Sequence, residues 1–354
     1  MNFASDTTAP AHPRILEALA RVNADPMPSY GADPVCARAE ARLAEVFETE
    51  VSVALTASGT ATNALALSLL APPWGAVFCH EEAHVHRDEN GAPEFFSGGL
   101  KLIPLPGEGA KIAPETLKAR LADWPSDFVH TPCGAAVTLS NLSEAGTAWS
   151  PDEVGGLAEV AHAAGLAVHM DGARFANALV SGRASPAELT WRAGVDVLSF
   201  GASKNGALGC EAIVLFGDHR DKRGELDRRL KRSGHMAPKQ RYLGAQLEAY
   251  LADDLWLDLA RTANARAQAL AQGAGALGVR TRWPTQGNEV FLVLEDAVAD
   301  RLKAAGAVFY PFMGPKTYRF VCAWTTTTAE VEAALGALSA ALGETALGAA
   351  AQAG

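Results

Sequence analysis

A single lysine, Lys204, stands in a stretch of small residues directly after a short apolar run. The stretch reads VLSFGASKNGALG over residues 197–209. The apolar run is typical of a buried strand, whereas most lysines lie in solvated surface positions. An amine held at a rigid strand end can form a Schiff base with a carbonyl compound. Lys204 is therefore the first candidate for covalent chemistry.

Two further strand ends carry groups that could act with this lysine. Asp171 directly follows the apolar run 166–170, and TASGTATNAL at 56–65 is a small-residue turn that opens into a helix. The backbone N–H groups of Gly59 and Thr60 would lie at the positive end of that helix, where a phosphate binds. Taken singly, each feature is also typical of an ordinary helix cap.

The combination of the three features indicates pyridoxal 5'-phosphate. This cofactor needs a site for its phosphate, a carboxylate beside its pyridinium nitrogen and a lysine that forms the Schiff base. The turn, Asp171 and Lys204 supply these three groups. The sequence therefore predicts pyridoxal phosphate as the cofactor.

The surrounding elements must bring these groups to one place. Helical patterns separate several strand-like runs, and one of them begins at Ser150 with a capping box. This alternation predicts an α/β fold with a mostly parallel sheet flanked by helices, whose ligands bind at the carboxyl ends of the strands. The predicted strands cover 51–55, 76–79, 101–105, 135–139, 166–170, 196–200 and 212–216.

The pattern changes after about residue 250. A long helix rich in alanine, leucine and arginine precedes strand-like runs at 288–295, 307–312 and 318–324, and a final helix follows. This order predicts a smaller α+β C-terminal domain. The predicted boundaries are an N-terminal segment over 1–13, a large cofactor-binding domain over 14–250 and the small domain over 251–354.

Composition limits the classes of partner. The 354 residues are 49% apolar and 20% charged, which is typical of a soluble globular protein. The net charge of −10 argues against general nucleic-acid binding, and no run of 18 apolar residues is present. Five scattered cysteines and an N-terminus without an export signal predict reduced thiols and a cytoplasmic location, with no membrane or nucleic-acid partner.

Residues 80–84 read HEEAH, which matches the zinc-protease pattern. That chemistry requires both histidines on one continuous helix. A predicted strand ends at Cys79 and the segment 88–93 breaks the chain, so a helix between them would have barely two turns. We therefore predict no metal, and a zinc hydrolase using His80 and His84 stays a remote alternative.

Eight motifs together carry a resemblance over nearly the whole chain. They are SDT at 5–7, YGADP at 30–34, SGTATN at 58–63, EAHVHRDENGAPEFFSGG at 82–99, SEAGT at 143–147, HMDGAR at 169–174, SFGASKNGALG at 199–209 and KRSGHMAPKQRYLGAQ at 231–246. With them the chain resembles the low-specificity L-threonine aldolases, including the phenylserine aldolases, of the aspartate-aminotransferase-like fold type I. The resemblance implies a lyase that reversibly cleaves L-threonine, L-allo-threonine or phenylserine-type substrates to glycine and an aldehyde.

The resemblance also implies roles for individual residues around the cofactor. Ser58, Gly59 and Thr60 would hold the phosphate. His84 would stack on the pyridine ring, Asp171 would bind its nitrogen and Lys204 would carry the Schiff base.

Substrate-binding residues follow from the same resemblance. Ser5, Arg174 and Arg319 would bind the amino-acid carboxylate, for which a guanidinium is suited. Tyr30 and Lys239 would contact the substrate, and Arg241 the cofactor, of a partner subunit. The implied assembly is a homodimer or homotetramer with a shared active site.

One position departs from the common family pattern. Many members carry a histidine in the loop corresponding to 141–146, where this chain has Glu144. An ordinary glutamate, with a pKa of about 4.3, is a weak proton acceptor unless burial raises that pKa. We therefore expect His84 to accept the proton of the substrate β-hydroxyl. An aminotransferase or a β-eliminating lyase would share Lys204 and Asp171 and stays an alternative.

Overall fold

The structure is a computed structural model that describes residues 1–125 and 128–352. Its main sheet has seven strands in the order β1-β7-β6-β5-β4-β2-β3. The neighbours from β6 to β3 run parallel, and β7 is antiparallel to both β1 and β6. The predicted mostly parallel sheet is confirmed, with strands β1 (Ser52–Thr56), β2 (Gly75–His80), β3 (Lys101–Leu105), β4 (Cys133–Ser140), β5 (Ala167–Gly172), β6 (Val197–Gly201) and β7 (Glu211–Leu215).

Helices cover both faces of this sheet. Side chains alternate along a strand, and Val53 and Leu55 accordingly lie in one apolar core while Ala54 lies in another. The first core includes residues of α1, α2, α7 and α11, and the second includes α3 and α10. The helices of this part are α1 (Pro13–Val22), α2 (Pro34–Phe47), α3 (Gly59–Leu70), α4 (His84–Arg87), α5 (Ala92–Ser97), α6 (Pro114–Ala122), α7 (Pro151–Ala163), α8 (Phe175–Ser181), α9 (Pro186–Leu189), α10 (Arg223–Ser233) and α11 (Arg241–Leu251).

The capping signal at Ser150 works as expected. The Ser150 hydroxyl accepts the backbone N–H of Glu153, the Glu153 carboxylate accepts the backbone N–H of Ser150, and Pro151 is the first helical residue. These two hydrogen bonds satisfy donors that have no partner inside the helix. The start of α7 is therefore dictated by local sequence.

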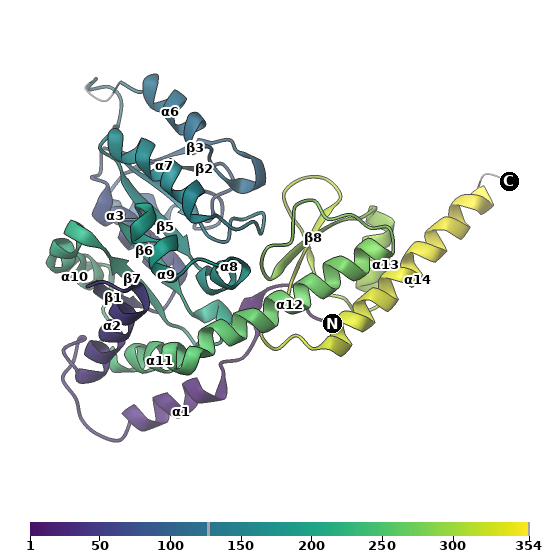
Figure 1. Cartoon of the computed structure of the whole chain (residues 1–354), viewed down its shortest axis with the longest axis horizontal. Helices are drawn as coiled ribbons and strands as arrows, with labels where there is room; N and C mark the ends of the chain where they lie inside the picture. The colour runs from purple at the N-terminus through teal and green to yellow at the C-terminus, as the bar shows by residue number, and fades with distance from the viewer. Residues whose placement is uncertain (126–127, 353–354) are drawn as a thin grey trace.

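The C-terminal part has its own small sheet and core. Strands β8 (Glu289–Val293), β10 (Thr317–Val321) and β9 (Tyr310–Pro311) pair antiparallel, and helices α13 (Asp296–Ala304) and α14 (Thr328–Gln352) lie beside them. Helix α12 (Leu255–Ala276) runs from the large part to the small part in Figure 1. Its residue Trp256 packs in a core of the main sheet, whereas Leu270 packs in the core of the small one. The smaller α+β part is confirmed, and its boundary at residue 250 stays a prediction.

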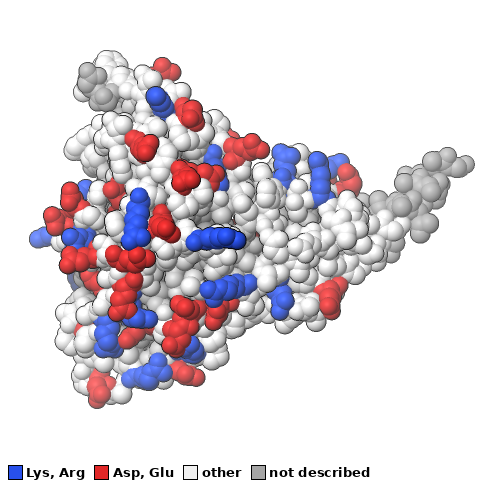
Figure 2. All heavy atoms as spheres, in the orientation of Figure 1, with Lys and Arg blue, Asp and Glu red and all other residues white. Residues whose placement is uncertain are grey.

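The surface carries no single dominant charge on the face drawn in Figure 2. Basic and acidic side chains are interspersed over the large part. Arginines of α10, for example, are paired with acids, as Arg229 is with Glu225. None of the described helices combines the length and the apolar character needed to cross a bilayer.

Candidate active site

A cavity of about 540 Å³ lies where three neighbouring strands end. Because β4, β5 and β6 are parallel, the residues that follow them meet at one edge of the sheet. The small part adds β8 and β10 to the opposite wall. Predicted site residues that line the cavity are Ser5, Ser58, Gly59, His84, Asp171, Arg174, Lys204 and Arg319.

The start of α3 forms a cradle for an anion. Ser58 is its N-cap, and the Ser58 hydroxyl accepts the N–H of Ala61 at 3.3 Å. The N–H groups of Gly59 and Thr60, in the first turn, have no acceptor inside the helix. A β-carbon at Gly59 would meet no atom within 4 Å, so the approach to these groups is open. The cradle fits a phosphate by its dipole and its free donors.

Asp171 is held as a buried, ionised carboxylate. It is 6% exposed, and its two oxygens accept the N–H of Ala173 at 2.9 Å and the amide of Asn63 at 2.7 Å. Burial alone would raise its pKa, but the positive charges of His84 and Lys204, together with these hydrogen bonds, lower it. The site therefore offers a fixed negative charge to a cationic ring nitrogen.

His84 is linked to a buried glutamate that the sequence did not indicate. Nδ1 of His84 lies 2.8 Å from Oε1 of Glu89, and the Asn63 amide donates to the same oxygen at 2.8 Å. The hydrogen bond with Glu89 raises the pKa of His84, and burial opposes this shift. Asn63 thus connects Glu89 with Asp171, and it fixes the position of both carboxylates.

Lys204 follows β6 in a short 3-10 turn, with a second glutamate near it. Glu211, the first residue of β7, lines the same cavity and accepts the N–H of Ala202 at 3.0 Å. Burial raises the pKa of Glu211 to about 7, while the charge of Lys204 acts in the opposite direction. Sequence reasoning missed Glu211 because it follows Lys204 in the antiparallel strand and belongs to no motif.

The end of the cavity predicted to bind a carboxylate contains two arginines and two acids. Arg174 donates to both oxygens of Asp6, from Nε at 2.8 Å and from Nη2 at 3.1 Å. Glu289 of β8 lies within ion-pair distance of Arg174 and of Arg319. Neither acid was singled out by the sequence, since each meets its arginine only through the tertiary fold.

Glu144 differs from the expectation for an ordinary glutamate. Its Oε1 accepts the backbone N–H of His84 at 2.9 Å and the hydroxyl of Ser140 at 2.6 Å. Burial raises the pKa of Glu144 to about 7, although these hydrogen bonds oppose the shift. Burial thus supplies the condition under which Glu144 can accept a proton, and the choice of His84 over Glu144 stays a prediction.

Four predicted residues do not line the cavity: Thr60, and the three residues predicted to serve a partner subunit, Tyr30, Lys239 and Arg241. Tyr30 lies beside the segment that carries Lys239 and Arg241, since its N–H donates to the carbonyl of Pro238 at 3.0 Å. Nε of Arg241 is buried without a hydrogen-bond partner in the described part of the chain. Their predicted role in a partner subunit stays a prediction.

The HEEAH segment does not form the helix that a zinc protease needs. Strand β2 continues through His80, whose ring bonds the Gly107 carbonyl at 3.0 Å, and α4 begins only at His84. Within residues 1–125 and 128–352, the group of metal-type donors that lies close enough for an ion is His84, Glu89 and Asp171, without His80. The zinc alternative therefore has no support.

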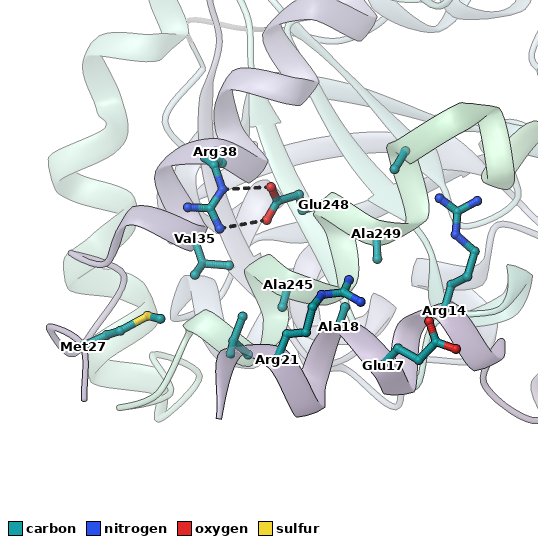
Figure 3. Close-up of a pocket in the computed structure, with 12 residues that line it drawn as sticks. Arg14, Glu17, Ala18, Arg21, Met27, Val35, Arg38, Ala245, Glu248 and Ala249 are labelled. Carbon is teal, nitrogen blue, oxygen red and sulfur yellow. Dashed lines mark hydrogen bonds and ion pairs between the residues drawn. The ribbon is translucent and has the colours of Figure 1, made fainter. Parts of the chain in front are cut away.

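A second cavity, of about 560 Å³, shows that volume alone does not identify the site. It lies between α1, α2 and α11 (Figure 3). Arg38 forms two hydrogen bonds with Glu248 there, and the floor is lined by small apolar residues such as Ala18 and Ala245. It contains neither a lysine nor a strand-end carboxylate.

Comparison with known proteins agrees with the geometry of the first cavity. Residues 2–297 match the family model described as beta-eliminating lyase. The chain belongs to this lyase family. The lyase is 42% identical to the low specificity L-threonine aldolase of Pseudomonas aeruginosa over 325 residues, 92% of this chain and 93% of that protein. The resemblance found in the motifs is thereby confirmed.

Solved structures support the same placement of the lyase. A threonine aldolase from Leishmania major superposes with a TM-score of 0.88 at 28% identity, over 95% of this chain and 98% of that one. An aspartate aminotransferase from Thermus thermophilus, at 17% identity, superposes with a TM-score of 0.71 over 96% and 91% of the two chains. The second likeness shows the fold, which is the predicted aspartate-aminotransferase-like fold type I.

The cofactor of the lyase is pyridoxal phosphate, and the residues present fit it. The cradle at Ser58 and Gly59 offers free donors for the phosphate, and Asp171 is ionised where a pyridinium nitrogen needs a counter-charge. Lys204 lines the same cavity with its amine. These residues offer the three groups that the cofactor needs.

Proposed function

We propose that the lyase reversibly cleaves β-hydroxy-α-amino acids, with L-threonine, L-allo-threonine or phenylserine-type compounds as substrates, to glycine and an aldehyde. The observation that carries the proposal is one cavity lined by Lys204, Asp171, His84 and the arginine pair. The names of the relatives support this substrate class. Bound pyridoxal phosphate supplies an electron sink for the breaking Cα–Cβ bond.

Each residue around the cofactor has a different role in binding it. Lys204 is the covalent attachment point, Ser58, Gly59 and Thr60 hold the phosphate, and Asp171 keeps the ring nitrogen protonated. The lowered pKa of Asp171 supports its role, because an ionised carboxylate stabilises the cationic form of the ring. His84 would stack on the ring, and its hydrogen bond to Glu89 would hold the imidazole in place.

The amino-acid carboxylate binds at Ser5, Arg174 and Arg319. Asp6 fixes the guanidinium of Arg174 through two hydrogen bonds, which reduces the freedom lost when substrate binds. Holding the carboxylate sets the rotation of the substrate about its Cα. This contact would orient the bond that is to break relative to the bound cofactor.

The proton of the β-hydroxyl passes to a base at the mouth of the cavity. Nδ1 of His84 is hydrogen-bonded to Glu89, which leaves Nε2 as the ring nitrogen that could accept a proton. Glu144 lies next to His84 and titrates near neutrality. We propose His84 as the acceptor and Glu144 as the group that positions the His84 backbone.

A second copy of the chain completes the site. Tyr30, Lys239 and Arg241 lie outside the cavity of their own chain and would reach that of the partner subunit, in a homodimer or homotetramer. The unpartnered Nε of Arg241 supports this proposal.

The five cysteines are free thiols, which supports a cytoplasmic location.

Product analysis of the purified enzyme tests the function. Incubation with L-threonine, L-allo-threonine and phenylserine is expected to give glycine and the aldehyde in equal amounts. Transfer of the amino group, or release of a keto acid, would instead identify an aminotransferase or a β-eliminating enzyme. Borohydride treatment is expected to fix the cofactor on Lys204, and a label on another lysine would overturn the site.

A further inference from the structure

Glu289 is a buried carboxylate whose hydrogen-bonding capacity is unused. It opens β8, lines the proposed active site and is 1% exposed. Within the residues that the structure describes, neither of its two carboxylate oxygens has a hydrogen-bond partner. A buried carboxylate without hydrogen bonds is costly, so its retention points to a role in binding or excluding a ligand.

The two acids at this end of the cavity differ in how they contact the arginines. Asp6 accepts two hydrogen bonds from Arg174 and one from the Asn288 amide at 3.0 Å. Glu289 lies 3.5 Å from Nη2 of Arg174 and 3.7 Å from Nη1 of Arg319. Asp6 therefore positions Arg174, whereas Glu289 stands between the two cations at ion-pair distance without a hydrogen bond to either.

The backbone keeps Glu289 in this place. A β-carbon added at Gly146 would lie 3.3 Å from Cβ of Glu289 and 3.0 Å from Phe291, so the loop packs closely against β8. Gly146 has a φ of 70°, which favours glycine. The main chain of Glu289 is thus held between this loop and β10.

Each arginine at this end of the cavity already lies within ion-pair distance of an acid. Arg174 and Arg319 contribute two positive charges, and Asp6 and Glu289 contribute two negative charges. One substrate carboxylate that pairs with the arginines brings one excess negative charge beside Glu289. A second carboxylate, on the neighbouring carbon of the same substrate, would bring another into a site of low dielectric constant, where like charges repel strongly.

We propose that Glu289 is a specificity-determining residue that restricts the site to β-hydroxy-α-amino acids with a single carboxylate and rejects those with a carboxylate in the side chain. This inference rests on the proposed function, in which Arg174 and Arg319 bind the substrate carboxylate. Rejection by an unfavourable charge is an established means of discrimination between similar ligands.

The test compares L-threonine with L-threo-3-hydroxyaspartate in the holoenzyme and in Glu289→Gln. The wild type is expected to prefer threonine in kcat/KM, and Glu289→Gln is expected to reduce this preference at least about tenfold, mainly through KM for the dicarboxylate. Calorimetric titration with the uncleavable ligands 2-aminobutyrate and aspartate is expected to show the same change in Kd. Glu289→Asp, which keeps the charge, is expected to stay close to the wild type.

A second acid gives the matched control. Asp258→Asn removes an exposed negative charge that does not line the cavity, so KM for both substrates and their ratio should stay unchanged. An unchanged ratio in folded Glu289→Gln, or a wild type that cleaves both substrates equally well, would overturn the role of Glu289. Should Glu289→Gln fail to fold, Glu289→Ala tests the same loss of charge. Failure of the wild type to release glycine from threonine would instead reject the proposed function.

Discussion

Asp171 shows how the surroundings of one residue decide its chemistry. Its lowered pKa depends on His84, Lys204 and two hydrogen bonds that outweigh burial. Asp171→Asn keeps the shape but removes the charge, so we expect turnover of L-threonine to fall by several orders of magnitude while the fold is retained. Steady-state kinetics and thermal unfolding check this. Exposed Asp258→Asn is the control, and an equally small effect in both variants would make Asp171 only a structural cap.

The proton acceptor can be assigned by comparing two neighbours. His84→Phe can still stack on the cofactor ring, and we expect it to bind cofactor but to lose at least about a hundredfold in turnover, as is typical of a lost general base. Glu144→Gln is expected to lose less, because it disturbs only the hydrogen bonds to His84 and Ser140. The reverse ranking would assign the proton to Glu144.

The pH profile gives a separate test of His84. A base acts only when deprotonated, so kcat/KM rises as pH passes through its pKa. The hydrogen bond with Glu89 raises the pKa of His84 above its ordinary value. Glu89→Gln is therefore expected to move this acidic limb to lower pH. The alternative is that the acidic limb of the profile belongs to Glu144, whose pKa lies near 7. In that case the limb would vanish in Glu144→Gln and would keep its position in Glu89→Gln.

At the scale of elements, a polar row crosses three strands beneath the active site. His169 of β5 bonds Thr138 of β4 at 2.8 Å through Nδ1 and Ser199 of β6 at 2.9 Å through Nε2. Burial lowers the pKa of His169 to about 4. The ring therefore stays neutral in the folded sheet over most of the range in which an unfolded histidine takes up a proton.

This row makes the sheet sensitive to acid. As pH falls from 6.5 towards 4, His169 binds a proton in the unfolded chain but stays neutral in the folded chain. The free energy of unfolding therefore falls by up to about 3 kcal/mol over this range. We expect His169→Gln to lose less stability than the wild type over this range, as measured by urea unfolding at pH 7 and pH 4.5. Equal losses in the two proteins would show that His169 does not limit acid stability.

At the scale of the whole molecule, the site draws on both parts of the chain and, by our proposal, on a second copy. Lys204 belongs to the main sheet and Arg319 to the small one, and α12 packs in the cores of both.

If Arg241 serves the partner subunit, mixing inactive Lys204→Ala with inactive Arg241→Ala subunits should restore some activity, because a hybrid contains one intact site. Native mass spectrometry verifies the hybrids, and verified hybrids without activity would argue against a shared site.

The sequence by itself determined the positions of the strands and the groups that follow them. Lys204, Asp171 and the turn at Ser58 could be found because each lies next to an apolar run, and a strand end is a local property of the chain. The seven predicted strands are all present. Their order, and the antiparallel direction of β7, could not be read because strand pairing joins segments far apart in sequence.

Only the tertiary structure decided the electrostatics of the site. Asn63 and Glu89 lie in quoted motifs without a predicted role, Glu211 and Glu289 lie in none, and all four reach the site from separate elements. The pKa of Glu144 could not be foreseen, because it depends on the burial of its carboxyl and not on its residue type. Residue types at strand ends thus predicted the cofactor, whereas the charge state of each group followed from neighbours that only the fold brings together.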